Sequence, residues 1–169
     1  MVALSILMIG LMGVLTLLSR SLLLQRVTSD QAKATYLASE GIEVAKSLID
    51  HEVYLSSSSN GAMGGFGTCP LSGDYDFDYE TYIDNTNACS LIQDYFTNDP
   101  LYFDAGTGLY YSSTDTDRPS AAVATNFVRK ITIANNGNEI DVKSTVTWNT
   151  GVIIGQSLTL EDRFYNWHP

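Results

Sequence analysis

The sequence predicts an α+β protein, with one long N-terminal helix packed on a C-terminal antiparallel β-sheet of three to four strands. Apolar residues fill the first 18 positions almost without interruption, and apolar or small residues then recur at helical spacing to about Asp50. Residues 127–162 instead alternate apolar and polar residues with the period of a strand. We expect an apolar helix over 1–26 that protrudes from a head over 27–169. The head comprises an amphipathic helix 27–53, a variable loop region 54–120 and the sheet 121–169.

The first stretch, MVALSILMIGLMGVLTLL, contains no charged residue, and the first charge of the chain is Arg20. A helix rises about 1.5 Å per residue and the hydrocarbon core of a bilayer is about 30 Å thick, so this stretch and the few residues after it just reach across. Only Ser5 and Thr16 interrupt the run, and a helix can return both hydroxyls to its own carbonyl groups. The segment therefore needs lipid or other protein around it.

The helical pattern continues beyond Arg26, and no proline occurs in the first 69 residues to break it. Lys33, Glu40, Glu43 and Lys46 are predicted on the faces away from the head. A cleaved secretory signal fits poorly, because the chain has no basic start and no small-residue cleavage site. A plain single-pass anchor remains an alternative. The predicted buried face consists of Val27, Ala34, Leu37, Ala38, Gly41, Ile42, Ala45, Leu48 and Ile49.

The formal net charge is −10, and it is unevenly distributed. Between His51 and Asp117 there are eleven acidic residues and no lysine or arginine. Phosphate binding needs a basic surface, so nucleic acid is disfavoured as a direct ligand of this region. The basic residues of the C-terminal part, such as Arg118, Arg129 and Lys143, do not cluster along the sequence.

Cys69 and Cys89 are the only cysteines, and both fall in the part expected outside the membrane. This placement favours a disulfide, which would stabilise a small domain by about 3 kcal/mol by closing a loop of about 20 residues. Two free, unrelated thiols are the alternative. A metal site is disfavoured, since no histidine or further cysteine is near either of them in the sequence.

The region after the helix contains loops and short elements. YLSSSSNGAMGGFG, residues 54–67, predicts a loop, because runs of serine and glycine neither sustain a helix nor pack a strand. LYFDAGTGLYYS predicts a hairpin with arms Leu101–Phe103 and Leu109–Ser112. DYDFDYETYI, residues 74–83, is a candidate strand, and SLIQDYF, residues 90–96, is a candidate helical turn.

The C-terminal part gives the clearest β pattern. FVRKITIA, EIDVKSTVTW and VIIGQSLTLED are joined by the short turns NNGN and NTG, which predicts an antiparallel meander. One face of each strand is apolar, so the sheet is expected to be covered on one side only, by the amphipathic half of the helix. In the last strand we expect this face to hold Val152, Ile154, Leu158 and Leu160.

These features together resemble those of bacterial type IV pilins and pseudopilins. The resemblance rests on VALSILMIGLMGVLTLLSRSLLLQRVTSDQAKATYLASEGIEVAKSLID and, more loosely, on FVRKITI, VTW and the closing FYNW. It implies a structural subunit, most simply a major pilin, that polymerises through its N-terminal helix into an extracellular filament. The expected filament-core residues are Val2, Leu4, Ser5, Ile6, Leu7, Ile9, Gly10, Leu11, Gly13, Val14, Leu17 and Leu18.

The chain departs from the family at its start. Family members are cut by a prepilin peptidase after a short basic leader, and the mature chain opens with a methylated residue followed shortly by a glutamate. This sequence has neither the leader nor that glutamate, so we expect the natural N-terminus a few residues upstream and transfer the glutamate to no position here. The partners implied are copies of the chain, the pilus assembly machinery and, before assembly, the cytoplasmic membrane.

Other functions remain as alternatives to a major pilin. One is a minor pilin or a type II secretion pseudopilin, and another is a monomeric single-pass surface protein, an adhesin or ligand-binding protein that uses its acidic, tyrosine-rich loops. Motility, adhesion, DNA uptake and conduction are not distinguished as uses of a filament. No cofactor is implied.

No sequence feature predicts an enzyme. There is no nucleophile motif, phosphate loop or zinc signature, and His51 and His168 are far apart in sequence. Asp74, Asp76, Asp78 and Glu80 are candidate calcium ligands by their spacing. The run is no EF-hand loop, because Tyr79 occupies the position of the required glycine. A solvated strand face, with Tyr75, Phe77 and Tyr79 turned inward, explains the alternation as well.

Overall fold

The computed structural model describes residues 2–60, 72–76, 78, 99–113, 115, 118–137, 139–151 and 153–165. For residues 2, 4 and 52–60 it describes the backbone alone. The chain divides into two compact units, residues 1–33 and 34–169, and each is described by itself. One long helix and two antiparallel sheets make this an α+β protein, as the sequence predicts.

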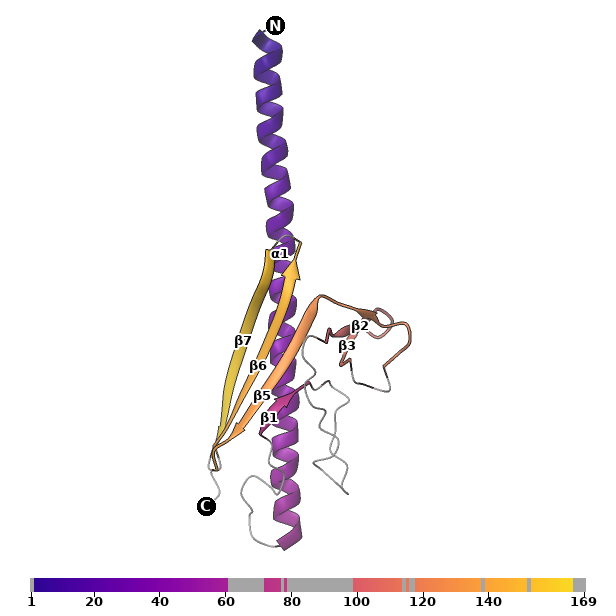
Figure 1. Ribbon diagram of the computed structural model, residues 1–169, viewed down its shortest axis with the longest axis vertical. Coiled ribbons are helices and arrows are strands. Elements are labelled where there is room, and N and C mark those ends of the chain that lie inside the picture. Colours follow the sequence, from indigo (N-terminus) through magenta and orange to yellow (C-terminus); the bar gives the residue numbers. More distant parts are fainter. Residues whose placement is uncertain are drawn as a thin grey trace. The chain divides into compact units, whose positions relative to one another are not determined.

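The helix α1 runs from Val2 to Asn60, a length of 59 residues (Figure 1). The prediction of a loop from Tyr54 is wrong for its first seven residues, because the run of four serines is helical. Extending a helix needs no new nucleus, and each serine costs only about 0.5 kcal/mol relative to alanine. The serine run therefore does not end the helix, and the described helix stops just before the first glycine of the predicted loop.

The larger sheet has four antiparallel strands in the order β1-β5-β6-β7 (Figure 1). They are β1 (Gly73–Tyr75), β5 (Phe127–Asn135), β6 (Glu139–Thr150) and β7 (Ile153–Tyr165). The predicted meander of β5, β6 and β7 is confirmed. The candidate strand over 74–83 is confirmed only at its start, since Asp76 and Asp78 lie outside β1.

The smaller sheet has three antiparallel strands in the order β3-β2-β4. The predicted hairpin is confirmed as β2 (Tyr102–Asp104) and β3 (Leu109–Tyr111). The Asp104 carboxylate holds its turn by accepting hydrogen bonds from the backbone N–H of Gly106 at 3.2 Å and of Thr107 at 3.1 Å. The two-residue strand β4 (Val123–Ala124) was not predicted, because so short a strand leaves no alternation to detect. The candidate helical turn at 90–96 lies outside the described residues.

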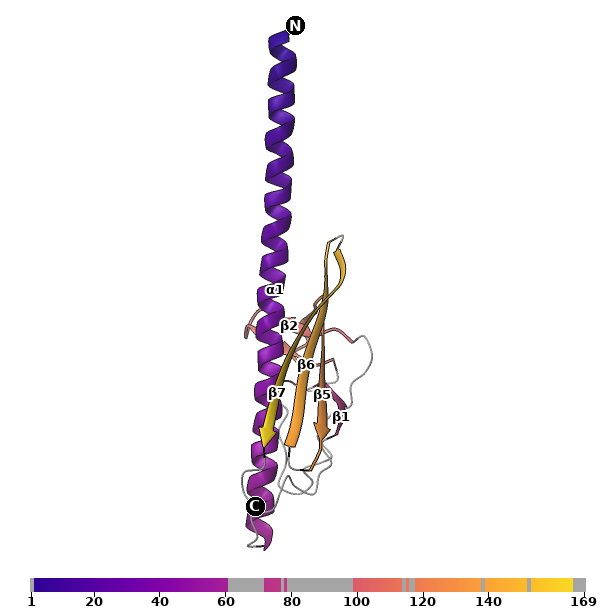
Figure 2. The same cartoon turned by 90° about the vertical axis from the view of Figure 1, so that its left-hand side faces the viewer.

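One face of the larger sheet is buried against the part of α1 that begins at Ala34 (Figure 2). Burial alternates strictly along β5 and β6, as the period-two pattern predicts. The predicted helix face is confirmed from Ala34 onward, because Ala34, Leu37, Ala38, Ala45, Leu48 and Ile49 are all buried. Val27, also predicted there, is only partly buried and belongs to neither core cluster. They pack mainly on Phe127, Ile131, Ile133, Ile140, Val142, Val146 and Trp148.

The prediction for the last strand is partly wrong. Leu158 and Leu160 pack against the core, whereas Ile154 is 81% exposed. The register of the β6–β7 pairing shifts between Trp148 and Thr150. The pairing of β5 with β6 ends at Phe127 and Trp148, so β5 does not extend to this end of the sheet. Ile154 therefore has no covering layer, although it lies on the same side of the strand as the partly buried Leu158 and Leu160. Val152 lies outside the described residues.

Gly41 marks the closest approach of the helix to the sheet. A Cβ atom at this position would lie 2.6 Å from Ser144 Oγ and 3.1 Å from Ile131 Cδ1. Both neighbours are fully buried, and Ser144 Oγ has no hydrogen-bond partner among the described residues. The helix can approach this closely because neither Gly41 nor Ser144 carries a large side chain.

We expect Gly41→Ala to lower the free energy of unfolding by up to about 2 kcal/mol, because an overpacking cost of about 1–3 kcal/mol exceeds the helix-propensity gain of about 1 kcal/mol. Ser144→Ala alone should be neutral or stabilising, since it removes an unpartnered buried hydroxyl. In the Ser144→Ala background, Gly41→Ala should cost clearly less. Denaturant unfolding of the four proteins in detergent measures the coupling. Additive effects would contradict the proposed contact.

Candidate functional site

The first candidate site is the apolar surface of α1 in residues 1–33. Its large apolar side chains are between 38% and 74% exposed. Consecutive residues on a helix point to all sides, so this surface surrounds the helix and does not form a single stripe. It consists of Ile6, Leu7, Met8, Ile9, Leu11, Met12, Val14, Leu15, Leu17, Leu18, Leu22, Leu23 and Leu24.

Three hydroxyl groups in this segment donate hydrogen bonds to carbonyl groups of the helix itself. Thr16 Oγ1 donates to the Met12 carbonyl at 2.8 Å, Ser19 Oγ to the Leu15 carbonyl at 3.0 Å, and Thr28 Oγ1 to the Leu24 carbonyl at 3.0 Å. The prediction for Thr16 is confirmed. Because these side chains use local acceptors, they do not require water, and the segment is suited to an apolar environment.

In the part of the chain that the structure describes, α1 is the one helix long and apolar enough to cross a membrane. The core helix of a soluble protein meets the same criterion of length, but its apolar residues are buried, whereas none of the most apolar window of α1 is buried within the chain. Such a helix near the N-terminus is consistent with membrane association, as an anchor or as a signal.

The predicted filament-core residues all lie in this segment. Ser5, Gly10 and Gly13 are exposed together with the predicted apolar residues from Ile6 to Leu18. Only the backbone is described at Val2 and Leu4. A Cβ atom at Gly10 or Gly13 would meet nothing within 4 Å, so these glycines leave open space beside the helix.

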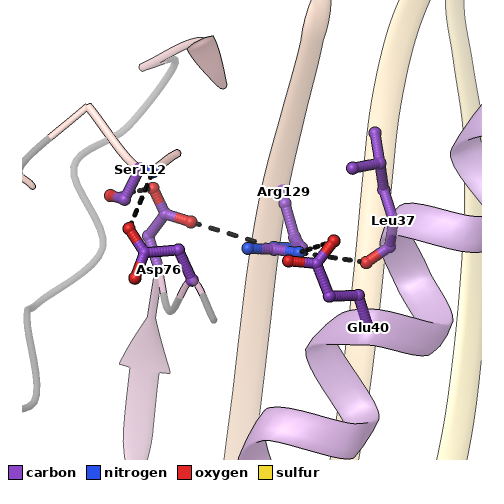
Figure 3. Close-up of polar contacts among 6 residues, drawn as sticks. Leu37, Glu40, Asp76, Ser112 and Arg129 are labelled. Carbon is purple, nitrogen blue, oxygen red and sulfur yellow. Dashed lines mark hydrogen bonds and ion pairs between the residues drawn. The ribbon is translucent and has the colours of Figure 1, made fainter. Parts of the chain in front are cut away.

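The second candidate site is a buried ionic network centred on Arg129 (Figure 3). Its guanidinium donates a hydrogen bond from Nη1 to the Leu37 carbonyl at 3.2 Å and lies 3.5 Å from Glu40 Oε2. Its Nε lies 4.0 Å from Asp76 Oδ1. The Arg129 side chain is fully buried and that of Asp76 nearly so, whereas Glu40 is 31% exposed. The network thus connects α1, β5 and the segment after β1.

Ser112 links this network to the end of β3. Its hydroxyl donates to Asp76 Oδ2 at 2.7 Å, and its backbone N–H donates to Asp78 Oδ2 at 3.1 Å. Two carboxyl groups, those of Glu40 and Asp76, therefore lie against the guanidinium, and Ser112 joins Asp78 to Asp76. Burial raises the pKa of Asp76 to about 6, against the opposing effects of the Arg129 charge and the Ser112 hydrogen bond. The neighbouring Asp78 and Asp99 raise this pKa further.

The acidic run does not form the solvated face that its alternation suggested. Asp74 is exposed and contacts Lys130 and Thr132, and Tyr75 is turned inward as expected. Asp76 and Asp78 are buried, which is the opposite of the prediction. The chain leaves β1 after Tyr75, so the alternation of a strand no longer sets their direction. Phe77, Tyr79 and Glu80 lie outside the described residues.

Within the described residues, no group of three His, Cys, Asp or Glu side chains is arranged to hold a metal ion. Asp74 and Asp76 have different cationic partners, Lys130 and Arg129. The predicted disulfide partners Cys69 and Cys89 lie outside the described residues. The calcium and disulfide hypotheses therefore stay predictions.

Sequence reasoning missed the role of Arg129, which was grouped with scattered basic residues. Its position in the strand could have revealed this role. Arg129 lies an even number of residues from Phe127, Ile131 and Ile133, so it falls on the same, buried face of β5. An arginine at an inward position needs buried anions. The acidic run was the nearest large source of anions in the sequence.

We expect Arg129→Met to lower the free energy of unfolding by about 3–5 kcal/mol, because it leaves Asp76 and Glu40 without their buried counter-charge. The matched control is Lys130→Met, the next residue in the same strand. Lys130 makes an exposed pair with Asp74 at 3.4 Å, and pairs of this kind contribute about 0–1 kcal/mol. Similar losses for the two variants would contradict a special role for the buried guanidinium.

The raised pKa of Asp76 predicts a pH dependence with a definite sign. The folded chain holds the Asp76 proton more tightly than the unfolded chain, so this group favours folding at acid pH, and the effect is lost as the pH rises from 3.8 to about 6. Asp76→Asn removes the ionisation. Its stability relative to the natural chain should therefore rise by up to about 3 kcal/mol across that interval.

Unfolding curves of the natural chain and of Asp76→Asn, measured at several pH values in detergent, test this prediction. Asp74→Asn, which removes an exposed carboxylate two residues earlier, controls for the loss of one negative charge. Parallel stability profiles for the natural chain and Asp76→Asn would contradict the raised pKa.

Comparison with known proteins adds no family assignment. No model of a protein family matches the chain, and neither a curated protein nor a solved structure matches it. The likeness to type IV pilins thus depends on the residues quoted for it and on the physical argument that follows. The α+β fold and the helix that could cross a membrane are the findings from which a function is inferred.

Proposed function

We propose that this protein is the structural subunit of an extracellular type IV pilus-like filament and that it polymerises through its N-terminal helix. The observation that carries the proposal is the apolar surface of α1, which extends over residues 6–24 and has no covering layer among the residues that the structure describes. Burying an exposed Leu, Ile, Val or Met side chain contributes about 1.5–3 kcal/mol, so this surface must be covered in every working state.

Two environments can cover this surface in succession. Before assembly, lipid surrounds the helix in the cytoplasmic membrane. In a filament, the same side chains pack on copies of themselves, and lipid contacts are exchanged for helix contacts. A helix that is apolar on all sides can contact a neighbouring copy through two different faces. When the rotation from one copy to the next does not close into a ring, such heterologous contacts generate an open helical fibre.

Small residues support close packing between copies. Gly10 and Gly13 are exposed, and the space beside each is open within the chain. In an apolar environment, small residues let helix backbones approach closely, which supplies the packing energy that the hydrophobic effect no longer provides. We therefore infer that these glycines lie where neighbouring helices come nearest.

The head is suited to the outside of such a filament. Its core is completed by the second half of α1, and it presents charged pairs such as Lys143 with Glu161 and Arg163 with Asp141 to solvent. With a formal net charge of −10, copies repel one another until the apolar helices are brought together. In this proposal the helix supplies the cohesion and the head supplies a soluble exterior.

Replacing both Gly10 and Gly13 by leucine tests the proposal. The double variant keeps the helix apolar and meets no atom within the chain, so it should fold and insert into membranes like the natural protein. The added side chains should keep neighbouring helices apart, and we expect the yield of filaments to fall by at least about tenfold. Met12→Leu, a volume-conserving change between the two glycines, should leave the yield unchanged.

Electron microscopy of sheared surface material, together with membrane fractionation, measures both properties. If the natural chain enters the membrane but forms no filament, alone or with other subunits, it is a single-pass surface protein and the proposal fails. A filament that incorporates it only alongside a more abundant subunit would indicate a minor pilin or pseudopilin. Equal filament yields for the double variant and Met12→Leu would contradict the assigned role of the glycines.

A further inference from the structure

The turn between β6 and β7 is apolar and exposed. Ile154 is 81% exposed, the most exposed large apolar side chain that the structure describes in residues 34–169, and Ile153 is 37% exposed. Gly151 and Gly155, with φ of 57° and 74°, flank them and allow the tight reversal of the chain. We call residues 149–151 and 153–156 the hairpin tip.

The hairpin tip extends past the rest of the sheet. The pairing of β5 with β6 begins at Phe127 and Trp148, so residues beyond Trp148 have no β5 residue beside them (Figure 1). The tip is held instead by local contacts. Thr150 Oγ1 donates to Gln156 Oε1 at 3.1 Å, and the Gly155 N–H donates to Asn149 Oδ1 at 2.8 Å. Its isoleucines therefore project without a packing partner in their own sheet.

Charge is absent from this end of the larger sheet, although Asp30 and Lys33 of α1 precede the first covered helix residue, Ala34. No charged residue occurs in the sequence from Ser144 to Leu160, from Pro119 to Val128 or from Ala34 to Ser39. Every charged residue of β1, β5, β6 and β7 lies at or beyond the register of Arg129 and Val146, toward the β5–β6 turn. The sheet thus has a charged end and an uncharged end, and the uncharged end carries the exposed isoleucines.

The uncharged end is also the end at which α1 enters the head. Trp148 belongs to the same buried cluster as Ala34, Leu37 and Ala38, the first residues of α1 that the core covers. Only ten residues separate Ala34 from Leu24 in the apolar surface of α1, about 15 Å of helix. When the apolar surface spans a bilayer, this short connection limits how far Ala34 can lie from the lipid headgroups.

We propose that the hairpin tip inserts Ile153 and Ile154 into the interfacial zone of the bilayer that α1 spans. A projecting, uncharged turn with adjacent large apolar side chains is suited to the boundary between headgroups and acyl chains. The contact rests on α1 spanning the membrane and not on polymerisation, so it goes beyond the proposed filament function and can fail independently of it. It gives the membrane-bound subunit a second point of attachment.

Fluorescence depth measurement on the full chain in phosphatidylcholine vesicles tests the contact. Ile154→Trp places a probe at an exposed position of the tip, and Asn136→Trp places one in the exposed β5–β6 turn at the other end of the sheet. Emission from the native Trp148 and Trp167 is subtracted with the unmodified chain. Lipids brominated near the headgroup should quench the added emission of Ile154→Trp more than about twofold over that of Asn136→Trp.

An aqueous quencher in the same vesicles completes the test. It should reach the added probe of Asn136→Trp and leave that of Ile154→Trp protected. If the aqueous quencher reaches both and the brominated lipid quenches neither, the tip lies in water and the inference fails. If the Ile154→Trp probe is protected from both quenchers, increasingly so at higher protein density, a second copy of the chain covers the tip, which also overturns the bilayer contact.

Discussion

The close packing of α1 on the sheet is the constraint on which the rest of the head depends. Small residues at 34, 38, 41 and 45 follow one another at intervals of four, three and four, and so form a stripe along one side of the helix. This stripe faces the fully buried Ser144 and Ile131 at the Gly41 contact. Leu37, Leu48 and Ile49 flank it and fill the space at either end. A larger residue in the stripe would lift the helix and open both core clusters at once.

The same packing explains why the buried arginine is surrounded by so many partners. Once the helix lies on the sheet, an inward-facing residue of β5 at position 129 has no route to solvent, and its charge must be matched inside the protein. Glu40 supplies one carboxylate from the helix, and Asp76 supplies another from the chain leaving β1. The network therefore sets where that segment can lie. The raised pKa of Asp76 follows from the same enclosure, because burial disfavours its charged form by more than the Arg129 charge and the Ser112 hydrogen bond favour it.

The elements governed by regular periodicity were predictable, and those governed by long-range partners were not. The helix face, the β5–β7 meander and the β2–β3 hairpin follow from alternation and turn residues, which are local properties. Asp76 has an arginine partner more than 50 residues away and Asp78 has Ser112, 34 residues away, so an alternating pattern alone assigned both to solvent. Ile154 shows the opposite error, since it was predicted to be buried and is exposed. It alternates in phase with Leu158 and Leu160, but β7 extends beyond the part of the sheet that is covered. The candidate membrane helix was the most predictable feature, because its composition alone fixes the environment it needs.

The two halves of α1 are suited to different environments. The change between them lies near Ala34, where small residues begin to replace large ones. In residues 6–24 leucine, isoleucine, valine and methionine occupy all sides, which suits lipid or identical neighbours that can approach from any direction. From Ala34 onward, apolar residues are confined to one side, which suits a single sheet in a fixed orientation. Such a chain cannot bury its first half by folding alone, since its own sheet is already covered by the second half. Its apolar surface is therefore left for an environment outside the described residues, which is consistent with a membrane around this helix.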